Sequence, residues 1–165
     1  MRLKRTVAAV GVVVLAGALG AAAGQLEDGI SLFNQGKFAE AEAALRGAEG
    51  AEASAYLAAS LAKQKKYGDA EGPARDALAG DPASDVAAGA LGEALVGQKK
   101  YDAAVDQLSA VLAKKELPHA YFWRAQAYDK KNQAARMVAD YQTFVKLAPK
   151  APEAASVQAL LASLK

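Results

Sequence analysis

The residues that could carry chemistry in this sequence are few, and they are not grouped. His119 is the only histidine, and it follows Leu117-Pro118 at the start of a predicted helix. A metal site of ordinary ligand spacing draws on several His or Cys side chains, and the chain has no cysteine. We therefore predict that His119 is a surface or interface side chain and that no metal is bound.

Nucleophilic and acid–base chemistry also lack a recognisable arrangement. The serines and threonines are scattered, with neither a Gly-x-Ser-x-Gly elbow nor a Gly-Lys-Ser/Thr phosphate loop around them. Carboxylate pairs such as Glu40/Glu42 and Asp102/Asp106 fall on predicted outer helical faces, where solvated charge is the ordinary outcome. The sequence thus predicts a protein that is not an enzyme and that takes no cofactor.

The first 23 residues have the plan of an export signal. A basic start (Arg2, Lys4 and Arg5) precedes an apolar run over 7–19 and small residues over 20–24. This order is typical of a secretory signal peptide, and we predict cleavage after Ala23 and a periplasmic or cell-envelope location. The alternative is an uncleaved inner-membrane anchor over residues 7–24. A spanning helix needs about 20 strongly apolar residues, whereas this run is rich in glycine and alanine.

Without that leader the chain is close to neutral. The whole sequence has 20 basic and 18 acidic residues, and three of the basic ones lie in the leader, which leaves 17 against 18. No net charge favours nucleic acid as a partner. The absence of cysteine excludes disulfides, and the abundance of alanine favours helices.

The strongest signal is an internal repeat. Residues 64–70 (Gln-Lys-Lys-Tyr-Gly-Asp-Ala) recur as residues 98–104 (Gln-Lys-Lys-Tyr-Asp-Ala-Ala), which lie 34 positions later. Residues 35–41 have the same form, and residues 130–135 are a weaker copy that lacks the aromatic residue. Apolar residues that follow Tyr101 recur at three- and four-residue steps, as on one face of a helix. Helical pairs of this kind must stack to bury their faces.

The pattern resembles the tetratricopeptide repeat (TPR), a pair of antiparallel helices of about 34 residues. At the position where the family has a small residue in the first helix, this sequence has Gly29, Ala58, Gly92 and Ala125. The proline that closes the family's repeat appears here as Pro82 and Pro149. The resemblance implies an all-α, right-handed solenoid of about four helix-turn-helix repeats with a C-terminal capping helix. The expected units are 24–50, 51–83, 84–116 and 117–150, with the cap over 151–165. That last helix is expected from about Pro152, with Val157, Leu160, Leu161 and Leu164 as its apolar stripe.

Three departures from the repeat predict local irregularities. The interval from Gly29 to Ala58 is 29 residues, and Gly47 and Gly50 are expected to shorten a loop there. Pro73 falls inside a second helix, which it is expected to kink or delay. In the fourth unit Met137 and Phe144 replace small residues, which favours more widely spaced helices.

In this family the first helices line a concave groove that receives a partner's peptide or helix, so the resemblance implies a groove in this chain. Its expected residues are Ile30, Phe33, Ala55, Ala59, Lys63, Gly89, Glu93, Val96, His119, Phe122 and Gln126. Small residues flanked by phenylalanines favour an apolar helix or extended peptide. Lysine pairs at the turns form a second, weaker candidate, a basic rim of Lys65, Lys66, Lys99, Lys100, Lys130 and Lys131.

These features predict a protein-binding adaptor of the periplasm or cell envelope. The first alternative is a membrane-tethered scaffold, in which residues 7–24 remain in the bilayer and the lysine rim faces lipid. The second is a self-associating element that uses the open end of the first repeat. The expected partner is another protein, not nucleic acid, and any membrane contact would come through residues 7–24.

Overall fold

The computed structural model describes residues 24–164, and the predicted signal peptide lies outside this range. No strand occurs within the described range, which opens with a helix over residues 24–34. The helices that follow are α2 (Phe38–Leu45), α3 (Ala51–Lys63), α4 (Tyr67–Gly80), α5 (Asp85–Gly97), α6 (Tyr101–Leu112), α7 (Pro118–Lys130), α8 (Ala134–Leu147) and α9 (Ala154–Ser163).

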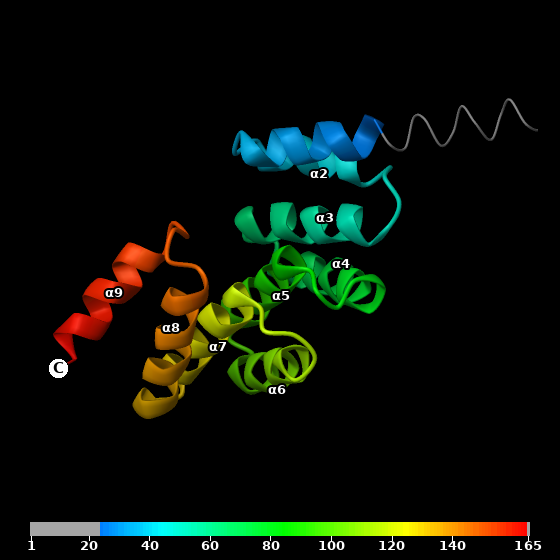
Figure 1. Ribbon diagram of the computed structural model, residues 1–165. Helices are drawn as coiled ribbons and strands as arrows, with labels where there is room; N and C mark the ends of the chain where they lie inside the picture. Colours follow the sequence, from blue (N-terminus) through cyan, green and yellow to red (C-terminus); the bar gives the residue numbers. More distant parts are fainter. Residues whose placement is uncertain (1–23, 165) are drawn as a thin grey trace, which may run out of the picture.

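Successive helices run antiparallel in pairs, and the pairs stack along a curved path from the 24–34 helix to α9 (Figure 1). Each second helix packs on its own first helix, as α4 does on α3 and α8 does on α7. The first helices also contact one another from pair to pair, α3 with α5 and α5 with α7. The predicted all-α fold of stacked helical pairs is confirmed.

The turn inside each pair has one repeated geometry. Gly36, Lys65, Lys99 and Asn132 all have left-handed backbone conformations, with φ of 76°, 62°, 60° and 56°. In the second pair, Lys65 N–H donates to the Ala62 carbonyl and Lys66 N–H donates to the Leu61 carbonyl. This is a Schellman motif, which satisfies carbonyls at a helix end, and the other three pairs repeat the same two hydrogen bonds.

The equivalence of these turns fixes the register of the weak fourth copy. Asn132 occupies the place of Lys65 and Lys99, and Gln133 occupies the place of the second lysine. The pair Lys130/Lys131 therefore lies earlier in its turn than the pairs Lys65/Lys66 and Lys99/Lys100.

Small residues allow the stacked helices to approach closely. A Cβ added at Gly92 would lie 2.3 Å from Trp123 Cβ, so α5 and α7 could not pack as they do with a larger residue there. In the first pair a Cβ at Gly29 would lie 2.5 Å from Leu45 Cγ. At the equivalent positions of the other pairs, Ala58 and Ala125 are fully buried. The core is therefore largely alanine and leucine.

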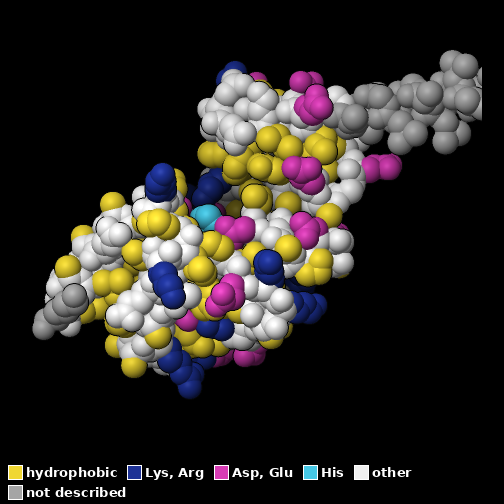
Figure 2. Space-filling view, in the orientation of Figure 1, with side chains coloured by type: hydrophobic (Ala, Val, Ile, Leu, Met, Phe, Trp, Pro, Cys, Tyr) yellow, Lys and Arg dark blue, Asp and Glu magenta, His cyan; other side chains and the backbone are white. Residues whose placement is uncertain are grey.

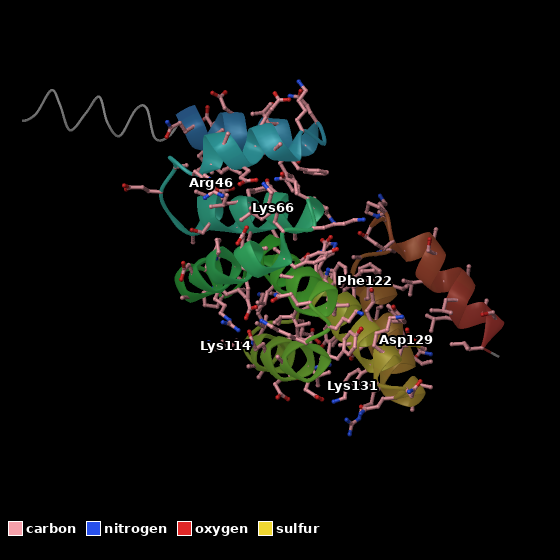
Figure 3. The ribbon with its side chains drawn as sticks, turned by 180° about the vertical axis from the view of Figure 1, so that it is seen from behind. Arg46, Lys66, Lys114, Phe122, Asp129 and Lys131 are labelled. Atoms are coloured by element: carbon pink, nitrogen blue, oxygen red, sulfur yellow. The ribbon has the colours of Figure 1, made fainter. Side chains whose placement is uncertain are left out.

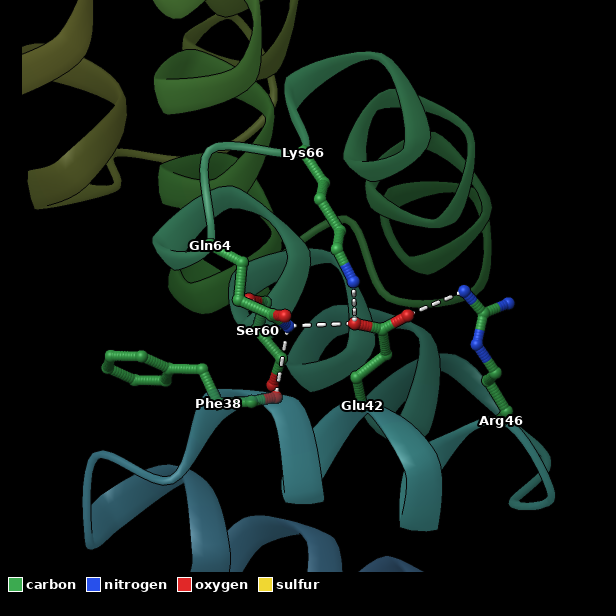
Figure 4. Close-up of polar contacts among 6 residues, drawn as sticks. All are labelled: Phe38, Glu42, Arg46, Ser60, Gln64 and Lys66. Carbon is green, nitrogen blue, oxygen red and sulfur yellow. Dashed lines mark hydrogen bonds and ion pairs between the residues drawn. The ribbon is translucent and has the colours of Figure 1, made fainter.

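A polar cluster joins the first pair to the second (Figure 4). Glu42 on α2 accepts hydrogen bonds from Arg46 Nη2 at 2.6 Å and from Lys66 Nζ at 2.8 Å. Gln64 Nε2 contacts the same carboxylate at 2.8 Å and the Phe38 carbonyl at 3.1 Å. These contacts hold the pKa of Glu42 at about 2, with the Lys66 hydrogen bond as the largest cause. We call this cluster the Glu42 latch.

The latch recurs one repeat later with the same residue types. Glu71 is bound by Lys100 Nζ at 2.9 Å and by Gln98 Nε2 at 3.0 Å, and Arg75 Nη2 lies 2.5 Å from its other oxygen. The Lys100 hydrogen bond lowers the pKa of Glu71. At the next junction Val105 stands in the place of the glutamate, and Lys131 pairs instead with Asp102.

The fourth pair is held by a different buried ion pair. Arg124 on α7 donates to both carboxylate oxygens of Asp140 on α8, at 2.7 and 2.8 Å, and to Ser109 Oγ on α6 at 3.0 Å. The Arg124 side chain is 17% exposed and the Asp140 side chain 9%. Such a bidentate pair fixes three helices relative to one another.

Two of the predicted irregularities and the predicted last helix take another form. The helix α4 begins at Tyr67 and runs through Pro73 to Gly80, so the proline neither delays nor ends it. The short first interval comes from α2, which has only 8 residues against 14 in α4, and not from a shortened loop. The last helix begins at Ala154 rather than at Pro152, and its stripe is only partly covered: Val157 is buried, but Leu160 and Leu164 are 39% and 54% exposed.

Candidate binding groove

The first helices of the pairs enclose a hollow on the inner side of the curved stack. Figure 2 shows the surface hollowed between the N-terminal helices and the rest, with the chain's single histidine, in cyan, inside it. The cavity has a volume of about 230 Å³, and we call it the groove. Its lining combines apolar and charged side chains: Phe33, Ala59, Lys63, Asp85, Val86, Gly89, Ala90, Glu93, His119, Trp123, Pro152 and Glu153.

The structure brings together six of the eleven residues that the sequence placed in a groove, namely Phe33, Ala59, Lys63, Gly89, Glu93 and His119. Ala55 is buried against α4 and α5, and Val96 packs on the core. Ile30 and Gln126 are half-buried outside this lining.

Phe122 belongs to the core of the fourth pair rather than to the groove. It is 9% exposed and lies against Tyr141 and Phe144, with ring centroids 6.0 and 5.1 Å away (Figure 3). Its remaining edge lines a second, shallower hollow under α9, which also contains Val157 and Leu160.

One wall of the groove carries a histidine between two carboxylates. His119 Nδ1 lies 2.5 Å from Asp85 Oδ2, and the His119 backbone N–H donates to Asp85 Oδ1 at 2.9 Å. His119 Nε2 lies 3.9 Å from Glu153 Oε2, in the segment that leads to α9. The Asp85 hydrogen bond raises the pKa of His119, because it stabilises the protonated ring more than burial destabilises it.

An ion pair from α3 to α5 also lines the groove. Lys63 at the end of α3 contacts Glu93 on α5, with Nζ and Oε2 2.8 Å apart. The lining also has an apolar part, which we call the apolar floor: Phe33, Val86 and Trp123 together with the small residues Ala59 and Gly89. Phe33 is itself fixed by edge contacts with Phe38 and Tyr56, each at a centroid distance of 5.4 Å.

Sequence reasoning missed the other six lining residues, of which Asp85, Trp123 and Glu153 are the most informative; the remaining three are Val86, Ala90 and Pro152. The repeat held a signal for Asp85, since neighbouring repeats place residues about 34 positions apart side by side and Asp85 precedes His119 by 34. Trp123 lies next to Gly92, the residue that marks the small position. Glu153 reaches the groove only because the loop between α8 and α9 returns to it, and no feature of the repeat predicts that.

The lysines of the predicted basic rim are partly neutralised. Lys66 pairs with Glu42, Lys100 with Glu71 and Lys131 with Asp102, while Lys130 pairs with its neighbour Asp129. Figure 3 labels two of the rim lysines, Lys66 and Lys131, which lie at separate places along the stack. Three of the six, Lys66, Lys100 and Lys131, thus join successive repeats.

Within residues 24–164 no group of three or more His, Asp or Glu side chains is placed to hold a metal ion. None of the helices in that range combines the length and the apolar character that crossing a bilayer would require.

Solved structures share this arrangement of helices. The structure of pilF from Pseudomonas aeruginosa superposes with a TM-score of 0.68 at 22% sequence identity, covering 88% of this chain and 69% of that one. MamA MSR-1 superposes with a TM-score of 0.57, also at 22% identity, covering 76% and 75% of the two chains. Both are TPR proteins, and at this identity the likeness establishes the fold. No protein-family model matches the sequence, and no curated protein matches it.

Proposed function

We propose that this protein is a non-enzymatic adaptor that holds a segment of another protein in the groove. The observation that carries the proposal is the groove itself, whose lining combines an apolar floor with the Lys63–Glu93 pair and the His119–Asp85 contact. Apolar surface that is concave and rimmed by polar groups is typical of binding sites. The TPR-like fold is consistent with a protein-binding scaffold.

We also propose that the chain is divided as the repeat predicts. The four repeat units are 24–50, 51–83, 84–116 and 117–150, and residues 151–165 form the cap. We also propose that residues 1–23 direct export to the periplasm or cell envelope. Determining the N-terminus of the native protein by mass spectrometry tests this, since a chain that starts at Gly24 supports cleavage and an intact Met1 contradicts it.

Crosslinking in the native envelope tests the docking role. A photoreactive residue at Val86, inside the groove, is expected to capture a discrete partner. The same residue at Asp106, which is exposed on α6 and outside the groove, is the control. A partner captured equally from both positions, or from Asp106 alone, would contradict docking in the groove.

The alternative with a lysine rim facing lipid is less well supported. Lys66, Lys100 and Lys131 already have carboxylate partners in neighbouring repeats, which reduces the positive charge that the rim offers to anionic head groups. We therefore place the functional surface in the groove.

A further inference from the structure

The charges that line the groove do not balance. Three carboxylates line it (Asp85, Glu93 and Glu153), against two groups that can be cationic (Lys63 and His119). Lys63 Nζ pairs with Glu93 Oε2 at 2.8 Å, and His119 Nδ1 pairs with Asp85 Oδ2 at 2.5 Å. Glu153 is thus the carboxylate without a cation of its own.

The Glu153 carboxylate is also short of hydrogen bonds. Its Oε2 is shielded from solvent but accepts no hydrogen bond from any residue in 24–164, and the nearest cationic atom is His119 Nε2 at 3.9 Å. That separation is longer than a hydrogen bond. A shielded carboxylate oxygen in this state is stabilised by an incoming N–H donor that carries positive charge.

The apolar floor lies directly beside this carboxylate. Phe33, Val86 and Trp123 line the same cavity as Glu153, and its volume of about 230 Å³ accommodates one or two large side chains rather than a folded surface. An occupant that suits both features must present an apolar side chain and a cationic one close together.

We propose that the groove selects partner segments in which a lysine or arginine neighbours a large apolar side chain. The apolar side chain packs on Phe33, Val86 and Trp123, and the cation binds Glu153. This inference rests on the proposed docking function and adds the chemical class of the occupant. Acidic segments are disfavoured, because they would place a third charge of the same sign against Asp85 and Glu153.

Synthetic peptides test this selectivity without knowledge of the natural partner. We would use three fluorescently labelled amphipathic peptides with leucine at three- and four-residue steps and with lysine, glutamine or glutamate at the remaining positions. Binding to the protein of residues 24–165 is measured by fluorescence anisotropy at low and high salt. We expect the lysine peptide to bind at least about tenfold more tightly than the glutamate peptide, with the glutamine peptide between them.

A matched pair of variants locates the effect. Glu153→Gln removes the unpaired charge and is expected to weaken binding of the lysine peptide about three- to tenfold while leaving the glutamine peptide unchanged. Asp106→Asn removes the same charge on α6, outside the groove, and is expected to change neither. Equal effects of the two variants would show that the peptides respond to any surface carboxylate of the protein, and they would overturn the inference.

The remaining outcomes separate this inference from the proposed function. Equal affinity for the three peptides, or binding of none, overturns selection of a basic occupant. The docking role itself is judged by the Val86 crosslink, which uses the native partner and not these peptides. If the crosslink forms while the peptides show no preference, only the chemical class is wrong; if the crosslink also fails, the docking role is wrong.

Discussion

At the scale of single residues, the turns inside the helical pairs place lysine where glycine is conformationally favoured. Lys65 and Lys99 have φ near +60°, a region that costs a residue with a side chain about 1 kcal/mol. Lys65→Gly should therefore stabilise the protein by about 0.5–1 kcal/mol, measured as the free energy of unfolding in urea.

Lys130→Gly is the control for that change. Lys130 ends α7 as a helical residue, so glycine there should destabilise by about 0.5–1 kcal/mol. Stabilisation at both positions would mean that the left-handed turn is not the cause.

The histidine of the groove gives a pH-dependent prediction. His119 faces Asp85 and Glu153, with Lys63 further away, and the Asp85 hydrogen bond raises the pKa of the ring. A raised folded-state pKa stabilises the protein fully below the unfolded value of about 6.5, and this stability is lost as pH rises through the folded value. Asp85→Asn should lower the His119 pKa and flatten the dependence of stability on pH above 6.5.

An NMR titration measures this pKa without ambiguity, because the chain has one histidine. Glu27→Gln, an exposed position in the 24–34 helix, is the control and should leave the titration unchanged. A His119 pKa that does not move in Asp85→Asn would contradict the assignment of the 2.5 Å contact as the main cause.

At the scale of the elements, the Glu42 latch joins α2 to the turn after α3. Glu42→Gln should destabilise the protein by about 1–3 kcal/mol at neutral pH, because Lys66 and Arg46 lose a shared anionic acceptor. Because the pKa of Glu42 is lowered to about 2, acid should weaken the stabilisation that the latch provides. The stability from the latch is present above the ordinary glutamate pKa of about 4.5 and is lost as pH falls towards 2.

Chemical unfolding at a series of pH values measures the difference in the free energy of unfolding between the unsubstituted protein and Glu42→Gln. The difference should be constant near neutrality and should shrink between pH 4.5 and about 2. Glu40→Gln, on the exposed face of the same helix, is the control and should be nearly neutral. A difference that is independent of pH over this range would show that Glu42 acts through packing and not through its charge.

The helices show which parts of the fold the sequence could predict. The literal recurrence of residues 64–70 at 98–104 and the apolar spacing after Tyr101 are local signals, and both predicted the stacked pairs. The delay predicted at Pro73 does not occur, because the tertiary contacts of Ala70, Ala74 and Ala77, all fully buried, hold α4 together across the missing N–H. Helix propensity alone does not contain that packing.

The groove was predictable only in part, for a related reason. Residues on the first helices follow the repeat, and six of the eleven residues that the sequence placed in the groove line the cavity. Phe122 was misplaced because the fourth pair has large residues, Tyr141 and Phe144, that draw it into their own core. Glu153 lies in a loop, whose path depends on contacts across the whole fourth pair and α9.

At the scale of the whole molecule, stability should be distributed along the stack rather than concentrated in one core. Contacts occur between neighbouring helices along the path, and the buried residues form several separate clusters. In such a repeat array a unit depends mainly on its neighbours, so its terminal pair can open by itself. A defect at the end of the stack should therefore act differently from the same defect in the middle.

Two identical substitutions at equally buried positions distinguish these cases. Leu45 in α2 and Leu95 in α5 are 1% and 0% exposed, so each change to alanine should cost about 2–5 kcal/mol locally. In Leu45→Ala, faster amide hydrogen exchange should be confined to residues 24–50, because the first pair opens on its own. In Leu95→Ala it should extend over both neighbouring pairs, since α5 contacts α3, α4, α6 and α7. Exchange that accelerates uniformly in both variants would instead indicate a single cooperative unit, in which the groove could not open at one end to admit a partner.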